Sequence, residues 1–176
     1  MEPAVRGGRP TPVSIAQRWP LVHPWLSTVA RLGLAAVWLV AGGSKVGDLA
    51  ASGRSVAAFK LMPVDLARVV GAALPFMELA MGVLLLVGLA TRLVAAISVA
   101  LLAVYIVGIA AAWARGLSID CGCFGGGGQL APGQHPNYGP DIARDVGLLL
   151  VAGFLVAWPR TRLAVDEWLR VGEEAA

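Results

Sequence analysis

The sequence predicts an all-α protein, a four-helix transmembrane bundle with short polar tails. Of the 176 residues, 57% are hydrophobic and only 14% are charged, whereas a soluble domain is about half apolar and about a quarter charged. The mean hydropathy is +0.73. The apolar residues are concentrated in four segments, and a helix that crosses a bilayer needs about 20 of them. Four such helices in a soluble protein of this length would leave too little polar surface to cover them.

The first predicted span covers about residues 26–43 and contains one charged residue, Arg31. The second covers about residues 69–90, and Glu78 is its one charged residue. Both segments are rich in alanine and glycine, which allows helices to pack closely in lipid.

The third predicted span, about residues 93–113, carries no charge. Only Thr91 and Arg92 separate it from the second, so these two spans should form a tight antiparallel pair. The fourth covers about residues 142–158, but its uncharged part starts only after Asp145, and Pro159 ends it.

The membrane domain is expected to occupy residues 25–159. Residues 1–24 are polar and rich in proline, and we expect a mobile cytoplasmic tail there. Residues 160–176 are expected to form a second cytoplasmic tail. Between the third and fourth spans lies a loop, residues 114–141, that contains both cysteines and a run of glycines.

The distribution of basic residues predicts how the chain is oriented. With four spans, both termini and the turn between the second and third spans lie on one side, which carries 8 Lys and Arg against 6 on the other. The positive-inside rule therefore places the termini in the cytoplasm of a multi-pass plasma-membrane protein and the cysteine loop outside. The net charge of +3 is too small to indicate a nucleic-acid partner.

Cys121 and Cys123 allow three hypotheses. They could be unrelated thiols, since cysteine often serves as a small apolar residue. They could bind a metal, but a structural zinc site takes four ligands and only His135 lies nearby, so we predict no metal. They could also form a redox pair that exchanges with a partner's thiols through a mixed disulfide. A disulfide across a single residue closes a small, strained ring, and strain makes a disulfide more reducible.

Four neighbours of the cysteines are predicted to support this redox pair, and they are Asp120, Gly122, Phe124 and Gly125. Gly122 can adopt backbone angles that other residues avoid. A charged Asp120 would disfavour a neighbouring thiolate, and Arg115 would oppose that effect.

Three polar residues are expected inside or beside the membrane core. Glu78 lies about ten residues into the second span, about 15 Å deep at 1.5 Å per residue, and an ionisable group at that depth suggests a function. Arg31 and Lys45 are the bases that could pair with it. Pro75, three residues earlier, is expected to kink the helix. The alternatives are a role in proton or redox chemistry and an ion pair that holds two helices together.

The stretch "RLGLAAVWLVAGGSKVGD" resembles the first helix of DoxX-like membrane proteins. "LPFMELAMGVLLLVG", followed by "IDCGCFG", resembles more narrowly the methylamine utilisation protein MauE family. The resemblance covers about residues 29–158. It implies a four-helix integral membrane protein that supports maturation of methylamine dehydrogenase, a disulfide-rich enzyme, beside a thioredoxin-like partner. The implied role is disulfide chemistry or export support.

Our leading hypothesis is thiol–disulfide exchange between the cysteine pair and an extracytoplasmic thioredoxin-like protein or a disulfide-containing client. Whether the chain is itself an enzyme stays open. One rival is a membrane scaffold or small-solute carrier in which the disulfide is a static staple. Another is a quinone-linked oxidoreductase subunit, which predicts a lipid-facing pocket near Glu78 and Pro75. A quinone is thus the candidate cofactor. The chain has a single cysteine pair and so cannot relay electrons between two pairs of its own.

Overall fold

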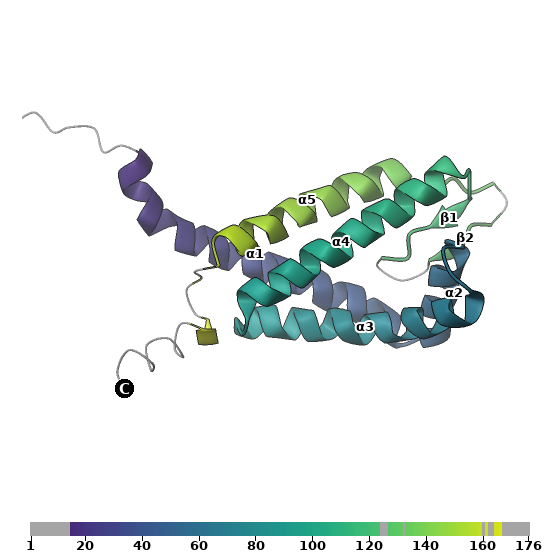
Figure 1. Ribbon diagram of the computed structural model, residues 1–176, viewed down its shortest axis with the longest axis horizontal. Helices are drawn as coiled ribbons and strands as arrows, with labels where there is room; N and C mark the ends of the chain where they lie inside the picture. The colour runs from purple at the N-terminus through teal and green to yellow at the C-terminus, as the bar shows by residue number, and fades with distance from the viewer. Residues whose placement is uncertain (1–14, 124–126, 132, 160, 162–163, 167–176) are drawn as a thin grey trace, which may run out of the picture.

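The protein is mostly helical, and its long helices lie side by side (Figure 1). The computed structural model describes residues 15–123, 127–131, 133–159, 161 and 164–166, and for residues 15–21 it describes the backbone alone. The helices and strands, in chain order, are α1 (Ile15–Val46), α2 (Leu49–Ala58), α3 (Val64–Val87), α4 (Thr91–Ala114), β1 (Ile119–Asp120), β2 (Gly128–Gln129) and α5 (Tyr138–Ala157). The predicted all-α class is confirmed, with one small hairpin added.

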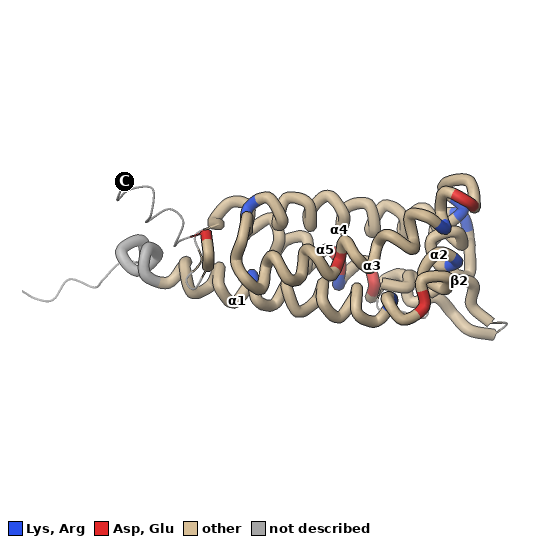
Figure 2. Tube along the Cα trace, turned by 90° about the horizontal axis from the view of Figure 1, so that it is seen from below, with Lys and Arg blue, Asp and Glu red and all other residues tan. Residues whose placement is uncertain are grey.

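Helix α1 packs along α3, and α4 packs along α5, while α5 also contacts α1 and α3 contacts α4. The short helix α2 and the two strands lie together at one end of these four helices (Figure 1). The turn between α3 and α4 lies at the opposite end, where α5 also ends. Figure 2 shows charged residues near both ends and a few between the helices.

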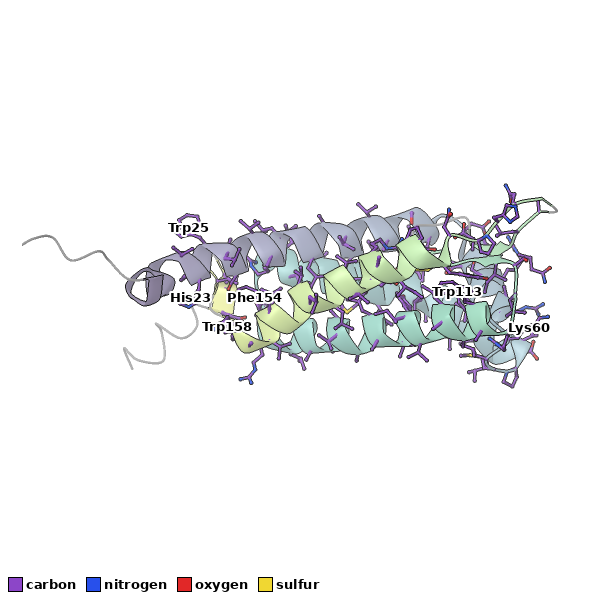
Figure 3. The ribbon with its side chains drawn as sticks, turned by 90° about the horizontal axis from the view of Figure 1, so that it is seen from above. His23, Trp25, Lys60, Trp113, Phe154 and Trp158 are labelled. Atoms are coloured by element: carbon purple, nitrogen blue, oxygen red, sulfur yellow. A yellow bond between two sulfur atoms is a disulfide. The ribbon has the colours of Figure 1, made fainter. Side chains whose placement is uncertain are left out.

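Three helices are long and apolar enough to cross a membrane, over Val22–Val46, Val64–Val87 and Thr91–Ala114. They correspond to the first three predicted spans. Large apolar side chains are exposed on their outer faces, as lipid contact requires. Exposed tryptophans mark the two ends (Figure 3), with Trp25 and Trp158 at one and Trp113 at the other. The fourth predicted span corresponds to α5, which has charged residues near its start and is not among the three.

The first two spans begin earlier than predicted. Helix α1 starts at Ile15, so the last part of the expected tail is helical, while residues 1–14 lie outside the described part of the chain. Helix α3 starts at Val64, directly after Pro63, and proline is favoured at helix starts because it has no N–H to leave unpaired. Pro75 lies inside α3, and the helix continues through it.

Helix α2 was not predicted, and it lies between the first two predicted spans. Asp48 begins it by accepting a hydrogen bond from the Ala51 N–H at 2.8 Å, as an N-cap residue does. Ser52 Oγ donates to the Gly71 carbonyl of α3 at 2.6 Å. A Cβ on Gly71 would lie 2.7 Å from the Gly53 Cα, so these two glycines let α2 and α3 touch through their backbones.

The contact between α1 and α3 is equally close. A Cβ on Gly42 would lie 2.7 Å from the Pro75 carbonyl oxygen, and one on Gly82 would lie 2.7 Å from Leu39 Cγ. Such small residues allow helices to approach closely in a membrane, where packing drives association. This contact sets the end of α1 beside the middle of α3.

Candidate functional site

The two cysteines form a disulfide with one another across a single intervening residue. Gly122, between them, has a φ of +68°, a left-handed conformation that favours glycine. The disulfide follows strand β1, which pairs with β2 so that Ile119 faces Gln129 and Asp120 faces Gly128. Phe124 and Gly125, the other predicted supporting residues, lie outside the described residues.

The disulfide loop is held against α2 and α5. A Cβ on Gly122 would lie 2.9 Å from the Gly127 Cα and 3.2 Å from Ser55 Cβ of α2. The Tyr138 hydroxyl, at the start of α5, accepts a hydrogen bond from the Ile119 N–H at 3.2 Å and donates one to the carbonyl of residue 117. These contacts fix where the two sulfurs lie.

A buried acid and its basic neighbour lie beside the sulfurs. The Asp145 side chain is buried, and its Oδ1 accepts a hydrogen bond from Arg144 Nε at 3.0 Å and lies 2.9 Å from Arg144 Nη2 in a salt bridge. Its second oxygen, Oδ2, has no hydrogen-bond partner among the described residues. A carboxylate oxygen of Asp145 and the sulfurs of Cys121 and Cys123 lie within 4.8 Å of one another. Arg144 also places Nη2 4.0 Å from Cys121 Sγ.

Arg144, rather than Arg115, is therefore the base next to the cysteines. Arg115 instead donates to the Phe59 carbonyl at 2.6 Å, beyond the end of α2. Asp120 is exposed and accepts a 3.4 Å hydrogen bond from the Gly122 N–H.

A second polar cluster lies between the helices. Lys45, near the end of α1, donates to both carboxylate oxygens of Glu78, at 2.7 and 2.9 Å. The Tyr105 hydroxyl of α4 donates to Oε1 of the same carboxylate at 2.8 Å. Glu78 is completely buried and Lys45 is 6% exposed. The acid that the sequence placed deep in the second span thus joins α1, α3 and α4.

Arg31 does not take part in this cluster. Its Nη1 donates to the carbonyls of Leu85 and Leu86 at 2.6 and 3.0 Å, so it binds the last turn of α3 at the opposite end of the helix. A cation at a helix C-terminus is favoured by the helix dipole and by the free carbonyls there. The contact assigns Arg31 a role in ending α3 at Gly88, whose φ is +77°.

One cavity of about 350 Å³ connects the disulfide with the polar cluster. Its walls include the two cysteines and Gly122 on one side and Lys45 and Tyr105 on another. The rest of the lining is almost entirely apolar and comes from α2, α3, α4 and the turn after α2. The cavity therefore brings together a disulfide, the polar side chains of Lys45 and Tyr105 and an apolar surface.

A family model described as methylamine utilisation protein MauE matches residues 23–158 of this chain. The chain belongs to the MauE family. The matched range runs from the start of the first candidate span to the end of α5 and includes the disulfide, the polar cluster and the cavity. Together with the apolar helices, it establishes an integral membrane protein of MauE type. Comparisons with curated proteins and with solved structures gave no significant match.

In this MauE protein the sulfur–carboxylate group is also the one group among the described residues whose donor atoms could hold a metal ion. A structural zinc site takes four ligands and needs thiolates. Here the two sulfurs are bonded to each other, and Asp145 supplies the one further donor of the group. The Arg144 cation contacts both Cys121 Sγ and the Asp145 carboxylate, which disfavours a metal cation there. His135, the additional ligand considered from the sequence, is exposed and is not in this group.

Three residues of the site were not predicted as site residues, and they are Tyr105, Arg144 and Asp145. Tyr105 is one of only two polar side chains in the uncharged third span, between about residues 93 and 113, and that rarity was a usable signal. Arg144 and Asp145 lie one turn into a helix, where charged residues usually face solvent. Nothing in the sequence indicated that they would lie beside the cysteines.

Proposed function

We propose that this MauE protein exchanges its Cys121–Cys123 disulfide with the thiols of an extracytoplasmic protein. The observation that carries the proposal is the disulfide itself, which joins half-buried cysteines beside a buried carboxylate with an unpartnered oxygen. A buried polar atom without a partner is costly, so it is retained where chemistry needs it. The proposed acceptor or donor is a thioredoxin-like protein or a disulfide-containing client.

A static staple is the weaker explanation of this disulfide. In the chain-entropy model, a cross-link that closes a loop of only three residues stabilises the folded state by about 1.6 kcal/mol, compared with about 3 kcal/mol for a 15-residue loop. The loop is moreover already held by Tyr138 and by the close packing of Gly122 on Gly127. Stabilisation of the loop is therefore a small part of what the disulfide contributes.

In the oxidising direction, a thiolate of the partner attacks one sulfur, and the Cys121–Cys123 bond breaks as the mixed disulfide forms. The released thiolate takes a proton. A second thiolate of the partner then attacks the mixed disulfide, which leaves the partner oxidised and both cysteines reduced. Asp145 is the group placed to give or accept the proton, because its carboxylate lies within 4.8 Å of both sulfurs.

Arg144 favours one order of attack. Its guanidinium lies 4.0 Å from Cys121 Sγ, and a neighbouring cation stabilises a thiolate. Cys121 is then the better leaving group, so the partner forms its covalent bond with Cys123.

We further propose that α5 is the fourth membrane span. It has 20 residues, about 30 Å at 1.5 Å per residue, which matches the hydrocarbon thickness. Beyond Arg144 its exposed positions within the helix are apolar, namely Val146, Gly147, Leu150 and Ala157. The charges in its first two turns are paired with each other, Arg144 to Asp141 at 3.2 Å and to Asp145 at 2.9 Å, which lowers the cost of their position at the membrane surface.

With four spans, the bias of basic residues supports cytoplasmic termini in the plasma membrane and a cysteine loop on the oxidising side, where disulfides persist. The description of the family names methylamine utilisation, so methylamine dehydrogenase is the client that the family implies.

The test is to trap the partner in intact cells. Thiols are quenched with acid and then labelled with a membrane-impermeant, mass-tagged alkylating reagent, in the wild type and in Cys121→Ser and Cys123→Ser variants. The expected result is a mixture of oxidised and reduced wild-type protein and a covalent partner that Cys121→Ser accumulates and Cys123→Ser does not. A fully oxidised cysteine pair with no covalent partner in either variant would refute the exchange function and favour the scaffold or carrier role. Labelling that occurs only after the membrane is permeabilised would show that the orientation is the reverse of the one proposed.

A further inference from the structure

Part of the lining of the cavity beside the disulfide is exposed on the outer surface of the helices. Three of its lining residues are also exposed large apolar side chains, Leu61 at 54%, Met77 at 38% and Val104 at 64%. Met77 and Val104 belong to α3 and α4, within two of the candidate membrane spans. A ligand that enters between them arrives through lipid, so it must be apolar itself.

The inner part of the same cavity offers hydrogen-bond donors. Lys45 uses two of the three N–H groups of its ammonium on Glu78, which leaves one for a ligand. The Tyr105 hydroxyl also lines the cavity and donates to the same carboxylate. Donors at the end of an apolar cavity suit a ligand with a carbonyl oxygen at one end and a hydrocarbon tail at the other.

The two sulfurs decide the class of that ligand. Cys121 and Cys123 line the cavity together with these donors, so a bound molecule lies next to a group that exchanges two electrons and two protons. A membrane quinone is an apolar carbonyl compound that likewise accepts two electrons and two protons. A fatty acid would satisfy Lys45 but would leave the disulfide in the wall without a function.

We infer that this cavity binds the ring of a membrane quinone and that the quinone reoxidises the Cys121–Cys123 dithiol. Two S–H bonds break and one S–S bond forms, while the quinone takes up two electrons and its two carbonyl oxygens each gain a proton, which gives the quinol. The remaining N–H of Lys45 donates a hydrogen bond to the carbonyl oxygen on which negative charge develops, and the Tyr105 hydroxyl helps to hold the Glu78 carboxylate that positions Lys45. The inference rests on the proposed exchange function, because the dithiol that the quinone oxidises is the product of that exchange.

Gly108 provides a way to fill the cavity without disturbing the helices. It lines the cavity, and a Cβ there would meet Phe59 Cδ1 at 3.8 Å and Leu61 Cδ1 at 3.9 Å, which are ordinary contacts. Gly108→Leu therefore places its side chain in the space of the ring, and Gly108→Ala takes up less of it. Gly153→Leu on α5 is the matched control, because a Cβ there meets no atom within 4 Å.

The experiment uses the purified full-length chain in lipid nanodiscs, reduced and freed of reductant, with decylubiquinone as the probe. Quinone absorbance and free thiols are followed together. We expect one quinone reduced per disulfide formed, a rate about tenfold lower in Gly108→Leu, an intermediate rate in Gly108→Ala and an unchanged rate in Gly153→Leu. Circular dichroism measures the helicity of each variant and so shows whether it is folded. If a variant that fills the cavity does not fold, Tyr105→Phe, which should also slow the reaction, takes its place.

The inference is overturned if decylubiquinone leaves the dithiol reduced, or if it oxidises the wild type and all variants at the same rate. It is also overturned if palmitate binds while the quinone does not react. Partner capture by Cys121→Ser is scored separately in cells. Capture without quinone reduction would therefore refute the quinone site and retain the exchange function, whereas quinone reduction without capture would refute the protein partner.

Discussion

Replacement of Lys45 by methionine removes the cation from the buried pair with Glu78 and keeps a side chain of similar length. The Lys45 nitrogen lies 2.7 Å from one carboxylate oxygen, and at an effective dielectric constant of about 20 Coulomb's law gives roughly 6 kcal/mol for unit charges at that distance. Desolvation offsets part of this energy. Measured losses from breaking buried pairs are about 3–5 kcal/mol, because the remaining charge stays buried and unpaired. We expect Lys45→Met to lower the free energy of unfolding by that amount.

The double variant Lys45→Met/Glu78→Gln should recover most of the loss. A glutamine at position 78 carries no charge, and its amide oxygen can still accept the hydrogen bond of the Tyr105 hydroxyl. In the wild type this hydroxyl lies 2.8 Å from Glu78 Oε1. Lys60, which is exposed after α2, provides the control, and Lys60→Met should change stability by less than about 0.5 kcal/mol. The assay is unfolding by titration with SDS, followed by far-UV circular dichroism. Equal stabilities of the single and double variants would refute energetic coupling of the pair.

Three further predictions concern packing, the cysteine loop and the proton. Gly42→Ala should cost about 1–3 kcal/mol in the same titration, because its Cβ would lie 2.7 Å from the Pro75 carbonyl oxygen. Gly43→Ala, where a Cβ meets nothing within 4 Å, should leave stability unchanged, and equal losses would refute the close contact. Tyr138→Phe removes the hydroxyl that binds two backbone groups of the cysteine loop, so limited proteolysis should cut that loop faster than in the wild type; an unchanged rate contradicts its anchoring role. Asp145→Asn should slow exchange with a model dithiol by about tenfold or more and flatten its pH dependence, and a preserved pH profile would exclude the carboxylate as the proton carrier.

Much of the fold was predictable because hydropathy is a local property. The first three predicted spans agree with the candidate membrane helices. The short separation near Thr91 correctly indicated a tight turn, but the tight pairing expected of these two spans is wrong, because α3 packs mainly on α1 and α4 mainly on α5. The errors lie at the ends and in the short elements. Helix α2 has only 10 residues and is moderately polar, so neither its length nor its composition separated it from a loop. Its stability comes from contact with α3 through Gly53 and Gly71, which is a property of the pair.

The site was predictable only in part, and the reason is again physical. Glu78 was found because a charge in a long apolar segment must have a partner, but the sequence left Arg31 and Lys45 as equal candidates. The choice depends on depth and on which face of each helix points inward. The close contact of Gly42 with Pro75 sets both, and it brings Lys45 rather than Arg31 to the carboxylate.

The sequence by itself determined that this protein is an all-α membrane protein of MauE type, that its two cysteines are separated by one residue, and that this residue, Gly122, can adopt backbone angles that other residues avoid. These features follow from composition, from adjacent residues and from local backbone preferences. Only the tertiary structure decided that Asp145 lies beside the sulfurs and that one cavity joins them to Lys45 and Tyr105. These groups come from segments far apart in the chain, and their meeting depends on how helices pack rather than on any local pattern.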